Sequence, residues 1–206
     1  MNTIIYLMRH SEPFKAHRGI KNTSESLLIE NEKSPLSING EKMAESWSCN
    51  KEFDNLSSVW SSNYVRAMST AKYFAYKNNL KVNIDERLNE RIHGVESWDE
   101  LPCDFEYRQF IDSNYKVKNG ENREEVSERL FSSLINILNE FKGGKILVVS
   151  HSTAIFFLLM KLCDIKSFDE CFFNDESFFD GCWNYLETFK LEFDSNNNLV
   201  NIRNIR

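Results

Sequence analysis

The segment Ile4-Ile5-Tyr6-Leu7-Met8-Arg9-His10-Ser11-Glu12 decides the fold of this chain. Its apolar run is typical of a buried β-strand, and the polar residues follow at the carboxyl end of that strand. In open α/β sheets, ligands bind at this edge. An imidazole beside a guanidinium suits a nucleophile held next to an anion, because Arg is always charged and its planar fork matches phosphate oxygens. Taken alone, such a pair is more often a surface Arg and a partly buried His.

A second strand end carries another guanidinium. The segment Val59-Trp60-Ser61-Ser62 predicts a short strand, and a helix follows it up to about Asn78. Arg66 lies in the first turn of this helix, where a cation is unfavourable unless an anion is bound. The position therefore indicates a bound phosphate, although an Arg that reaches a surface carboxylate would fit equally well.

A third strand end repeats the arrangement of the first. The continuous apolar run over 145–149 predicts a fully buried parallel strand. It leads into Ser150-His151-Ser152 and then into an apolar helix over 153–163. If the three strand ends share one edge of a sheet, two imidazoles and two guanidiniums form a cationic pocket there.

The rest of the chain predicts helices and strands around these three segments. Helical spacing covers 38–49, with Ser37 as the N-cap, and 123–141. Alternating apolar residues predict a third strand over 80–84 and a hairpin that pairs 185–193 with 199–205. The aromatic-rich segment 95–118 predicts a covering loop with one short helix. The loop over 11–36 carries basic groups that would help to receive an anion or would simply be solvated: Lys15, His17, Arg18 and Lys21.

Composition limits the class of protein. With 206 residues, 41% of them hydrophobic and 27% charged, the chain fits one domain with a sizeable core, over residues 1–206. A net charge of −6 gives no indication of nucleic acid or an anionic membrane as partner. No CxxC pair occurs among the five cysteines, which favours reduced thiols in a cytosol. No secretory signal is evident, and the longest apolar run, 154–160, is too short to cross a bilayer. We expect a soluble, cytoplasmic protein.

Three segments together carry a family resemblance. Residues 7–12 (Leu-Met-Arg-His-Ser-Glu), 61–71 (Ser-Ser-Asn-Tyr-Val-Arg-Ala-Met-Ser-Thr-Ala) and 150–152 (Ser-His-Ser) resemble the three signature segments of the histidine phosphatase superfamily. This superfamily includes the cofactor-dependent phosphoglycerate mutases and many small phosphatases. The resemblance extends from residue 4 to about residue 160. It implies a three-layer α/β/α sandwich with a mostly parallel central sheet, a cover or insertion at about 95–120 and a C-terminal hairpin at about 183–206.

The resemblance implies a role for each matching residue. His10 matches the nucleophile that becomes a phosphohistidine, and Arg9, Arg66 and His151 match the groups that surround the phosphate. Glu90 matches the acid that protonates the leaving oxygen and then activates water. Phosphoryl transfer depends mostly on positioning and charge stabilisation, so this set needs neither a metal nor a cofactor. The attacking imidazole must be neutral, so we expect an acceptor, such as a backbone carbonyl, on its other nitrogen.

The chain also departs from the family pattern. Ser11 and Ser152 stand where Gly is usual, and Ala16 stands where an Asn is common in the first loop. One phosphate contact would then have to come from another residue, with Ser11 and Lys15 as candidates. Glu12 is expected only to cap or orient.

Two activities within the family remain open. Residues 88–94 (Leu-Asn-Glu-Arg-Ile-His-Gly) are similar to the mutase form of the acid motif, in which Arg91 would match a substrate-binding Arg. Mutases, however, carry a longer insertion with paired arginines, where this chain has only Tyr107-Arg108-Gln109. Residues 118–122 (Lys-Asn-Gly-Glu-Asn) resemble the segment that comes directly before a helix in the small phosphatases of the family. We favour a phosphatase acting on a small phosphorylated metabolite.

Two further hypotheses come from other classes. One is a metal-dependent hydrolase with ligands among His10, His17, His93 and His151, which lack helical metal-binding spacing. The other is a phosphate- or phosphoprotein-binding module without turnover. For the substrate, the acidic residues of the cover would disfavour further negative charges: Asp99, Glu100, Asp104 and Glu106. The sequence contains no signal for the oligomeric state.

Overall fold

A mixed six-stranded sheet forms the centre of the computed structural model, which describes residues 1–14, 33–95 and 98–205. The strands, in the order β3-β2-β4-β1-β8-β9 across the sheet, are β3 (Val82–Ile84), β2 (Ser58–Ser61), β4 (Lys145–Ser150), β1 (Thr3–Arg9), β8 (Thr188–Phe193) and β9 (Leu199–Asn204). The first four of these are parallel, and β8 and β9 extend the sheet as an antiparallel hairpin.

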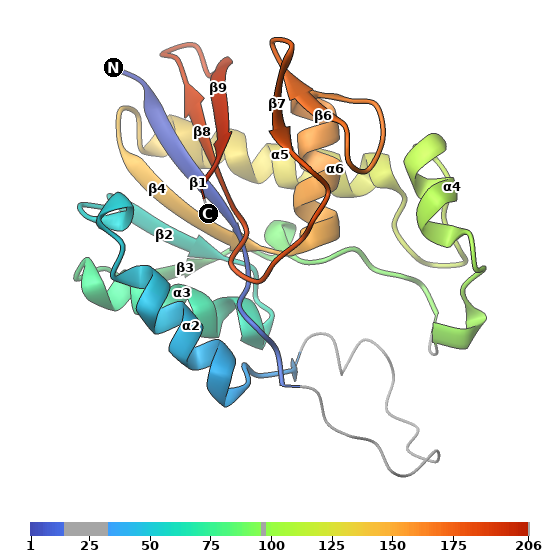
Figure 1. Cartoon of the computed structure of the whole chain (residues 1–206), viewed down its shortest axis with the longest axis horizontal. Coiled ribbons are helices and arrows are strands. Elements are labelled where there is room, and N and C mark those ends of the chain that lie inside the picture. The colour runs from blue at the N-terminus through green and yellow to red at the C-terminus, as the bar shows by residue number, and fades with distance from the viewer. Residues whose placement is uncertain (15–32, 96–97, 206) are drawn as a thin grey trace.

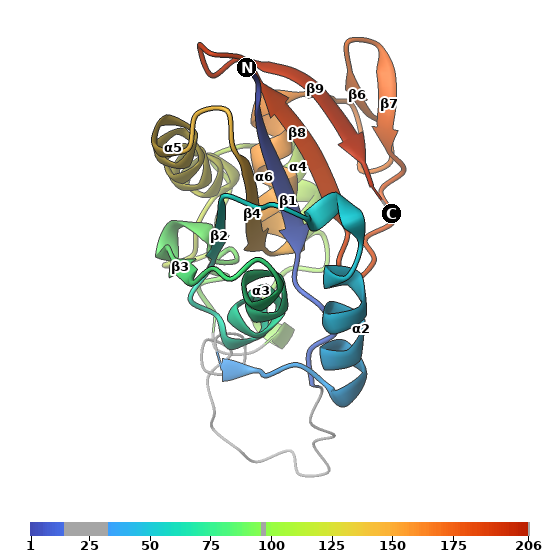
Figure 2. The same cartoon turned by 90° about the vertical axis from the view of Figure 1, so that its left-hand side faces the viewer.

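Helices cover both faces of this sheet, as Figures 1 and 2 show. The helices α2 (Ile38–Ser48) and α3 (Val65–Lys77) lie on one face, and α5 (Arg123–Glu140) and α6 (Ser152–Leu162) lie on the other. Alternate residues of β1 face the two layers: Tyr6 and Met8 pack toward α2 and α3, whereas Ile5 and Leu7 pack toward α5 and α6. The predicted three-layer α/β/α sandwich is confirmed.

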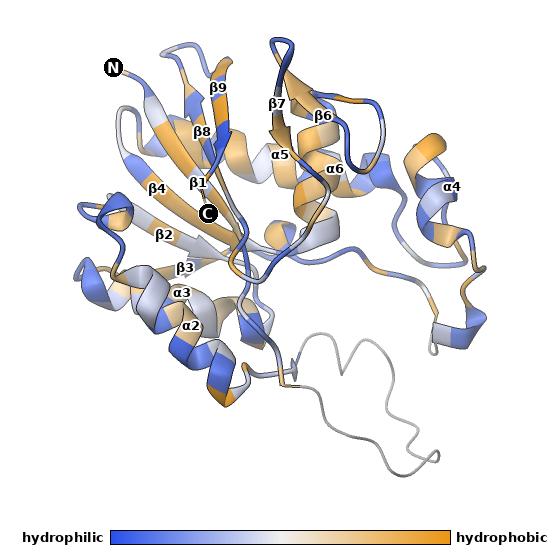
Figure 3. Cartoon of the chain, viewed as in Figure 1, coloured by the Kyte–Doolittle hydropathy of each residue, from blue (hydrophilic) through white to orange (hydrophobic). Residues whose placement is uncertain are grey.

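Local sequence explains why these elements form where they do. The run from Ile146 to Val149 is fully buried between two helical layers, so each residue of β4 can be apolar. Figure 3 shows the same apolar character in β1 and in α6. Helix α5 begins at a capping box in which Asn122 and Glu125 bond to each other's backbone N–H groups. Helix α2 begins at Ser37, whose Oγ accepts from the Gly40 N–H at 2.9 Å, as predicted.

A cover stands at the carboxyl end of the sheet. It contains the helix α4 (Phe105–Ile111), the single α-helix predicted for this region, and a turn of 3₁₀-helix over Trp98–Glu100. The two ends of the cover meet at a pair of glycines. A Cβ atom on Gly94, which has a φ of +75°, would lie 2.1 Å from the backbone N of Gly120, so neither position has room for a side chain.

Two features differ from the sequence-based expectation. The third strand is shorter than predicted and covers only Val82–Ile84. A second, three-stranded sheet, which was not predicted, forms from β5 (Asp164–Ile165), β6 (Cys171–Phe173) and β7 (Glu176–Phe179). Its apolar side packs on α6 and β8, where the rings of Phe179, Trp183 and Phe189 lie 5.0–5.7 Å apart. The predicted C-terminal hairpin is confirmed as β8 and β9.

Other expectations concern thiols, membranes and the first loop. All five cysteines are free thiols. In the described part of the chain, no helix is both long enough and apolar enough to cross a membrane. The basic residues expected to receive an anion, Lys15, His17, Arg18 and Lys21, and also Ala16, lie outside the described residues.

Candidate active site

Three parallel strands end side by side and bring the predicted residues together. β1 ends at Arg9 and is followed by His10, whose N–H donates to the Ser150 carbonyl at 3.0 Å. β2 is followed by Ser62, whose N–H donates to the Val149 carbonyl at 3.1 Å. His151 follows the end of β4 and is the N-cap residue of α6. The predicted meeting of these strand ends at one edge of the sheet is confirmed.

His10 is held as an oriented, neutral imidazole. Its Nδ1 lies 2.7 Å from the Ser11 carbonyl oxygen, which can only accept, so Nδ1 carries the proton. Nε2 then holds the lone pair, and it accepts from Arg66 Nε at 2.9 Å. Burial, and secondly the charge of Arg66, keep the pKa of His10 well below its usual range. The expectation of a backbone acceptor on the second nitrogen is met by Ser11.

His151 is fixed in the opposite tautomer. Its Nδ1 accepts from Arg66 Nη2 at 3.1 Å, because a guanidinium can only donate. Nε2 therefore carries the proton and donates to Ser62 Oγ at 2.8 Å. Burial and the charge of Arg66 also hold the pKa of His151 well below its usual range. The two imidazole rings are 5.1 Å apart, and Arg66 bridges them.

Arg66 is a buried cation near the start of α3. Its guanidinium lies 5.0 Å from the ring centre of Tyr64, whose edge also contacts the ring of His151 at 4.9 Å. Burial lowers the pKa of Arg66, while Glu90 acts in the opposite direction. A desolvated guanidinium that bonds two neutral imidazoles is a strong anion-binding group. The phosphate contact of Arg66 stays a prediction, which this burial and these bonds are compatible with.

Arg9 approaches the same place from β1. Its Nη1 donates to the Trp183 carbonyl at 2.9 Å, and its guanidinium lies 5.0 Å from the ring centre of Tyr185. Its Nε is buried and has no hydrogen-bond partner among the described residues. A buried donor without an acceptor is rare, and a phosphate oxygen would supply the missing acceptor.

Glu90 faces the site from the segment that follows β3. Its Oε1 accepts from the backbone N–H groups of Arg91 and Ala154, both at 2.9 Å, and the second of these belongs to the first turn of α6. The carboxylate is buried. Burial lowers the pKa values of both Arg9 and Arg66, and the negative charge of Glu90 partly offsets this effect at each guanidinium. The role of Glu90 as the acid stays a prediction.

One residue that was not identified from the sequence, Arg129 on α5, holds the Glu90 segment in place. Its Nη1 donates to the carbonyls of Arg87 and Asn89 at 2.7 and 2.8 Å, and its Nη2 donates to the Glu90 carbonyl at 3.1 Å. Glu121 binds the other side of this guanidinium at 2.7 and 2.9 Å. Nothing in the local pattern of α5 distinguishes Arg129 from a surface Arg, because its partners are carbonyls about 40 residues away.

The side chains of Ser11 and Glu12 in the first loop both bond to the start of α2. Ser11 Oγ donates to the Gly40 carbonyl at 2.7 Å, so this hydroxyl proton is engaged away from the phosphate position. The Glu12 carboxylate accepts from Ser37 Oγ and from Asn39 Nδ2, and it thereby orients the start of α2. Gly40 is required there, since a Cβ atom would lie 2.1 Å from the Glu12 carbonyl oxygen.

Arg91, the candidate for a second substrate contact, is already bonded to the cover. Its Nη1 donates to Glu106 at 2.9 Å and to Gln109 at 2.6 Å, and its Nη2 donates to Glu106 at 2.6 Å and to His93 Nε2 at 3.0 Å. Its side chain is only 2% exposed. A substrate carboxylate would have to displace Glu106 from Nη1 or Nη2, whereas the buried Nε has no hydrogen-bond partner among the described residues.

The acidic cover is largely compensated. Besides Glu106, Glu100 pairs with Lys118 and Asp104 with Arg108, each at 2.7 Å. Ion pairing of Glu100, Asp104 and Glu106 reduces the net negative charge of the cover, and the expected repulsion of further negative charges on the substrate stays a prediction.

The metal hypothesis finds no cluster of ligands. His93 lies in the cover against Arg91, apart from the pair formed by His10 and His151, and His17 is outside the described residues. Over residues 1–14, 33–95 and 98–205, no group of three or more His, Cys, Asp or Glu side chains could hold a metal ion.

Comparisons with known proteins agree with this geometry. The model of the histidine phosphatase superfamily (branch 1) matches residues 5–176. A probable phosphoglycerate mutase GpmB of Salmonella arizonae is 28% identical over 174 residues, which cover 81% of this chain and 77% of that protein. The phosphoserine phosphatase of Entamoeba histolytica in complex with 3-phosphoglyceric acid has a TM-score of 0.68 at 17% identity, covering 99% of this chain and 98% of that one. A mycobacterial glucosyl-3-phosphoglycerate phosphatase has a TM-score of 0.66 at 17% identity, covering 99% and 97%.

Proposed function

Because this chain belongs to the histidine phosphatase superfamily, we propose that it hydrolyses small phosphomonoesters through a phosphohistidine on His10, without a metal ion. One observation carries this proposal. The Nε2 lone pair of a buried, neutral His10 points at the guanidinium of Arg66, while its Nδ1–H is held by the Ser11 carbonyl. A nucleophile is thus oriented at the place where an anionic phosphoryl group would bind.

In the first half-reaction the phosphoryl oxygens of the substrate replace the two imidazoles as acceptors of the hydrogen bonds that Arg66 donates. The bond from His10 Nε2 to phosphorus forms as the bond from phosphorus to the ester oxygen breaks. Protonated Glu90 gives its proton to the leaving oxygen, and the alcohol departs. The Nδ1–H bond to Ser11 stabilises the positive charge that the imidazole gains as it becomes phosphorylated.

In the second half-reaction the Glu90 carboxylate takes a proton from water, and the water oxygen attacks phosphorus. The bond from His10 Nε2 to phosphorus breaks, so that inorganic phosphate and the starting imidazole are formed. Arg9, Arg66 and His151 surround the phosphoryl oxygens throughout. Two guanidiniums and a preorganised imidazole supply the electrostatic stabilisation that phosphoryl transfer needs.

Phosphoglycerate mutase-type transfer is the second candidate. It is favoured by the mutase-like segment 88–94 and by the relative from Salmonella, a probable phosphoglycerate mutase. Against it, Arg91, which would hold the substrate in a mutase, is bonded by Glu106 and Gln109. We therefore favour water, and not a hydroxyl of a second substrate, as the final acceptor of the phosphoryl group.

The test is hydrolysis of p-nitrophenyl phosphate between pH 5 and 8 with EDTA present, for the wild type and for His10→Ala. The proposal requires activity that survives EDTA and is lost in the variant. Loss of activity in EDTA would contradict metal-free chemistry. If neither protein turns over this ester, transfer between the positions of 3-phosphoglycerate would identify a mutase. Phosphate binding without turnover of either compound would identify a binding module.

A further inference from the structure

The turn over 183–187 holds Arg9 from three sides. The Trp183 carbonyl accepts from Arg9 Nη1 at 2.9 Å, and the Tyr185 ring lies 5.0 Å from its guanidinium. The Glu187 carbonyl accepts the backbone N–H of Arg9 at 2.9 Å. This turn lies beyond residue 176, where the family match ends, so none of these contacts follows from the signature segments.

The conformation of this turn is unusual. Leu186 has a φ of +63°, and among the described non-glycine residues with positive φ it is the only apolar one. Its N–H points to the His10 carbonyl at 3.5 Å, so the turn touches the nucleophile's backbone as well as Arg9. A bulky residue adopts this region only where surrounding contacts impose it.

A buried carboxylate supplies those contacts. Glu187 is 2% exposed, and its Oε2 accepts from the backbone and side-chain nitrogens of Asn184 at 3.1 and 3.0 Å. Its Oε1 accepts from Asn204 Nδ2 at 2.6 Å, across to the end of β9. Burial lowers the pKa of Arg9, and the negative charge of Glu187 is one of the groups that partly offset this effect.

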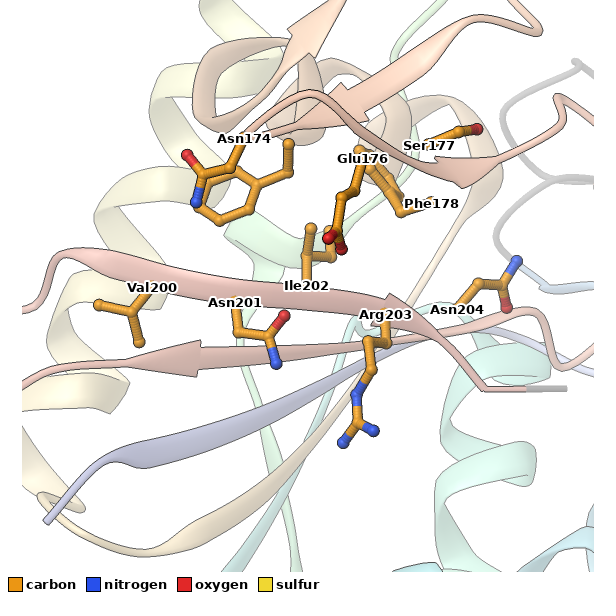
Figure 4. Close-up of a pocket in the computed structure, with 10 residues that line it drawn as sticks. Asn174, Glu176, Ser177, Phe178, Val200, Asn201, Ile202, Arg203 and Asn204 are labelled. Carbon is orange, nitrogen blue, oxygen red and sulfur yellow. The ribbon is translucent and has the colours of Figure 1, made fainter.

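Asn204 joins the turn to the edge of the sheet. Figure 4 shows it at the end of β9, where it lines a pocket between this strand and the β6–β7 hairpin. It holds Glu187 through its Nδ2 alone, because its Oδ1 is buried without a hydrogen-bond partner among the described residues.

We propose that Glu187 and Asn204 are positioning residues for Arg9: by bracing the turn over 183–187, they aim the guanidinium of Arg9 at the phosphoryl group. The inference rests on the proposed function, because Arg9 is a phosphate-binding residue only within it. A correctly aimed guanidinium forms two parallel bonds to phosphate oxygens, whereas a misplaced one forms one bond or none.

The same hairpin contains a matched control. Glu192 on β8 accepts from Asn201 Nδ2 on β9 at 3.3 Å, so it is also a carboxylate–amide pair between the two strands. Figure 4 labels both Asn201 and Asn204 along β9. Among the described residues, neither Glu192 nor Asn201 has a side-chain hydrogen bond or ion pair with the turn or with Arg9, so the loss of this pair changes the hairpin without changing the site.

The experiment measures inorganic phosphate binding by calorimetry and the KM and kcat for p-nitrophenyl phosphate, with EDTA present. We compare Asn204→Ala with Asn201→Ala, and Glu187→Gln with Glu192→Gln. The proposal predicts that phosphate binding and kcat/KM weaken about tenfold in Asn204→Ala and Glu187→Gln, as expected for the loss of one charge-assisted bond. Both controls should stay within about twofold of the wild type.

A thermodynamic cycle separates positioning from general destabilisation. In an Arg9→Ala background, Asn204→Ala should have no further effect on phosphate binding, because the residue acts only through Arg9. The inference is overturned if Asn204→Ala matches its control, or if its effect persists undiminished without Arg9. Asn204→Ala keeps the test valid even if Glu187→Gln fails to fold. Failure of the proposed function looks different, because the wild type itself would then bind no phosphate or release none from the ester.

Discussion

Replacing Arg66 with Met is expected to remove activity while leaving the protein at least as stable. The variant loses the bonds of 2.9 and 3.1 Å to His10 and His151, together with the charge that would face the phosphoryl oxygens. A donor aimed at charge that develops in the transition state is worth about 2.7–4 kcal/mol. We therefore expect kcat/KM to fall by about a hundredfold to a thousandfold.

The expected effect on stability has the opposite sign. Burial lowers the pKa of Arg66 despite the nearby Glu90, so the charged form is costly when no phosphate is bound. A Met side chain of similar length removes that cost and still packs beside Tyr64. Without ligand, the free energy of unfolding should be unchanged or higher than that of the wild type. Phosphate at about 100 times its Kd should stabilise the wild type by about 2.7 kcal/mol and leave Arg66→Met unaffected.

The assays are p-nitrophenyl phosphate hydrolysis, urea unfolding with and without phosphate, and titration of the imidazoles by NMR. Since Arg66 lowers the pKa of both His10 and His151, both pKa values should rise in the variant. Arg108→Met, in an exposed ion pair of the cover, serves as the control and should change activity little. The reasoning is refuted if Arg66→Met keeps kcat/KM within threefold, or if the imidazole titrations are unchanged.

Three further predictions concern neighbouring contacts. Ser62→Ala removes the acceptor of His151 Nε2–H and should lower kcat/KM about tenfold; a kcat/KM within twofold of that of the wild type would argue against it. Burial lowers the pKa of His93 to about 4, so the unfolded chain takes up a proton first as the pH falls. The contribution of neutral His93 to the free energy of unfolding is fully present above about pH 6.5 and is lost toward pH 4, by at most about 3 kcal/mol. The free energy of unfolding of His93→Gln should therefore fall less over this pH range than that of the wild type. Glu106→Gln leaves the buried Arg91 without its carboxylate and should lower the free energy of unfolding by about 1–3 kcal/mol. Asp104→Asn, in the exposed pair with Arg108, should lower it much less, and equal effects of the two substitutions in urea unfolding would contradict this.

Local patterns predicted the parts of the site that depend on strand ends. The buried run before His151 predicted a parallel strand, and the cation in the first turn of α3 indicated an anion, although a surface carboxylate fitted equally well. The three motifs together predicted the meeting of His10, Arg66 and His151, which the structure shows. Ser11 was one of two candidates for a phosphate contact, and its hydroxyl donates instead to the Gly40 carbonyl, 29 residues away, a partner that no local pattern indicates.

The missed features depend on pairings between distant segments. Ser62 bonds to His151, 89 residues away, and Arg129 bonds to the Glu90 carbonyl, 39 residues away. Neither partner could be assigned from the sequence, because no local pattern around Ser62 or Arg129 indicates which distant segment the fold brings to it. The small sheet of β5, β6 and β7 was missed because its strands have only two to four residues. Periodicity cannot be read over so few positions, and the aromatic residues suggested only general packing.

The most direct test of the central claim is to identify the phosphorylated nitrogen. The protein would be mixed with p-nitrophenyl phosphate, quenched in alkali within milliseconds, and the peptide that contains His10 examined by NMR and mass spectrometry. Because Nδ1–H is held by the Ser11 carbonyl and Nε2 faces Arg66, the account predicts phosphate on Nε2 of His10. Phosphate on Nδ1 or on another residue, or turnover with no phosphohistidine at any time, would contradict it.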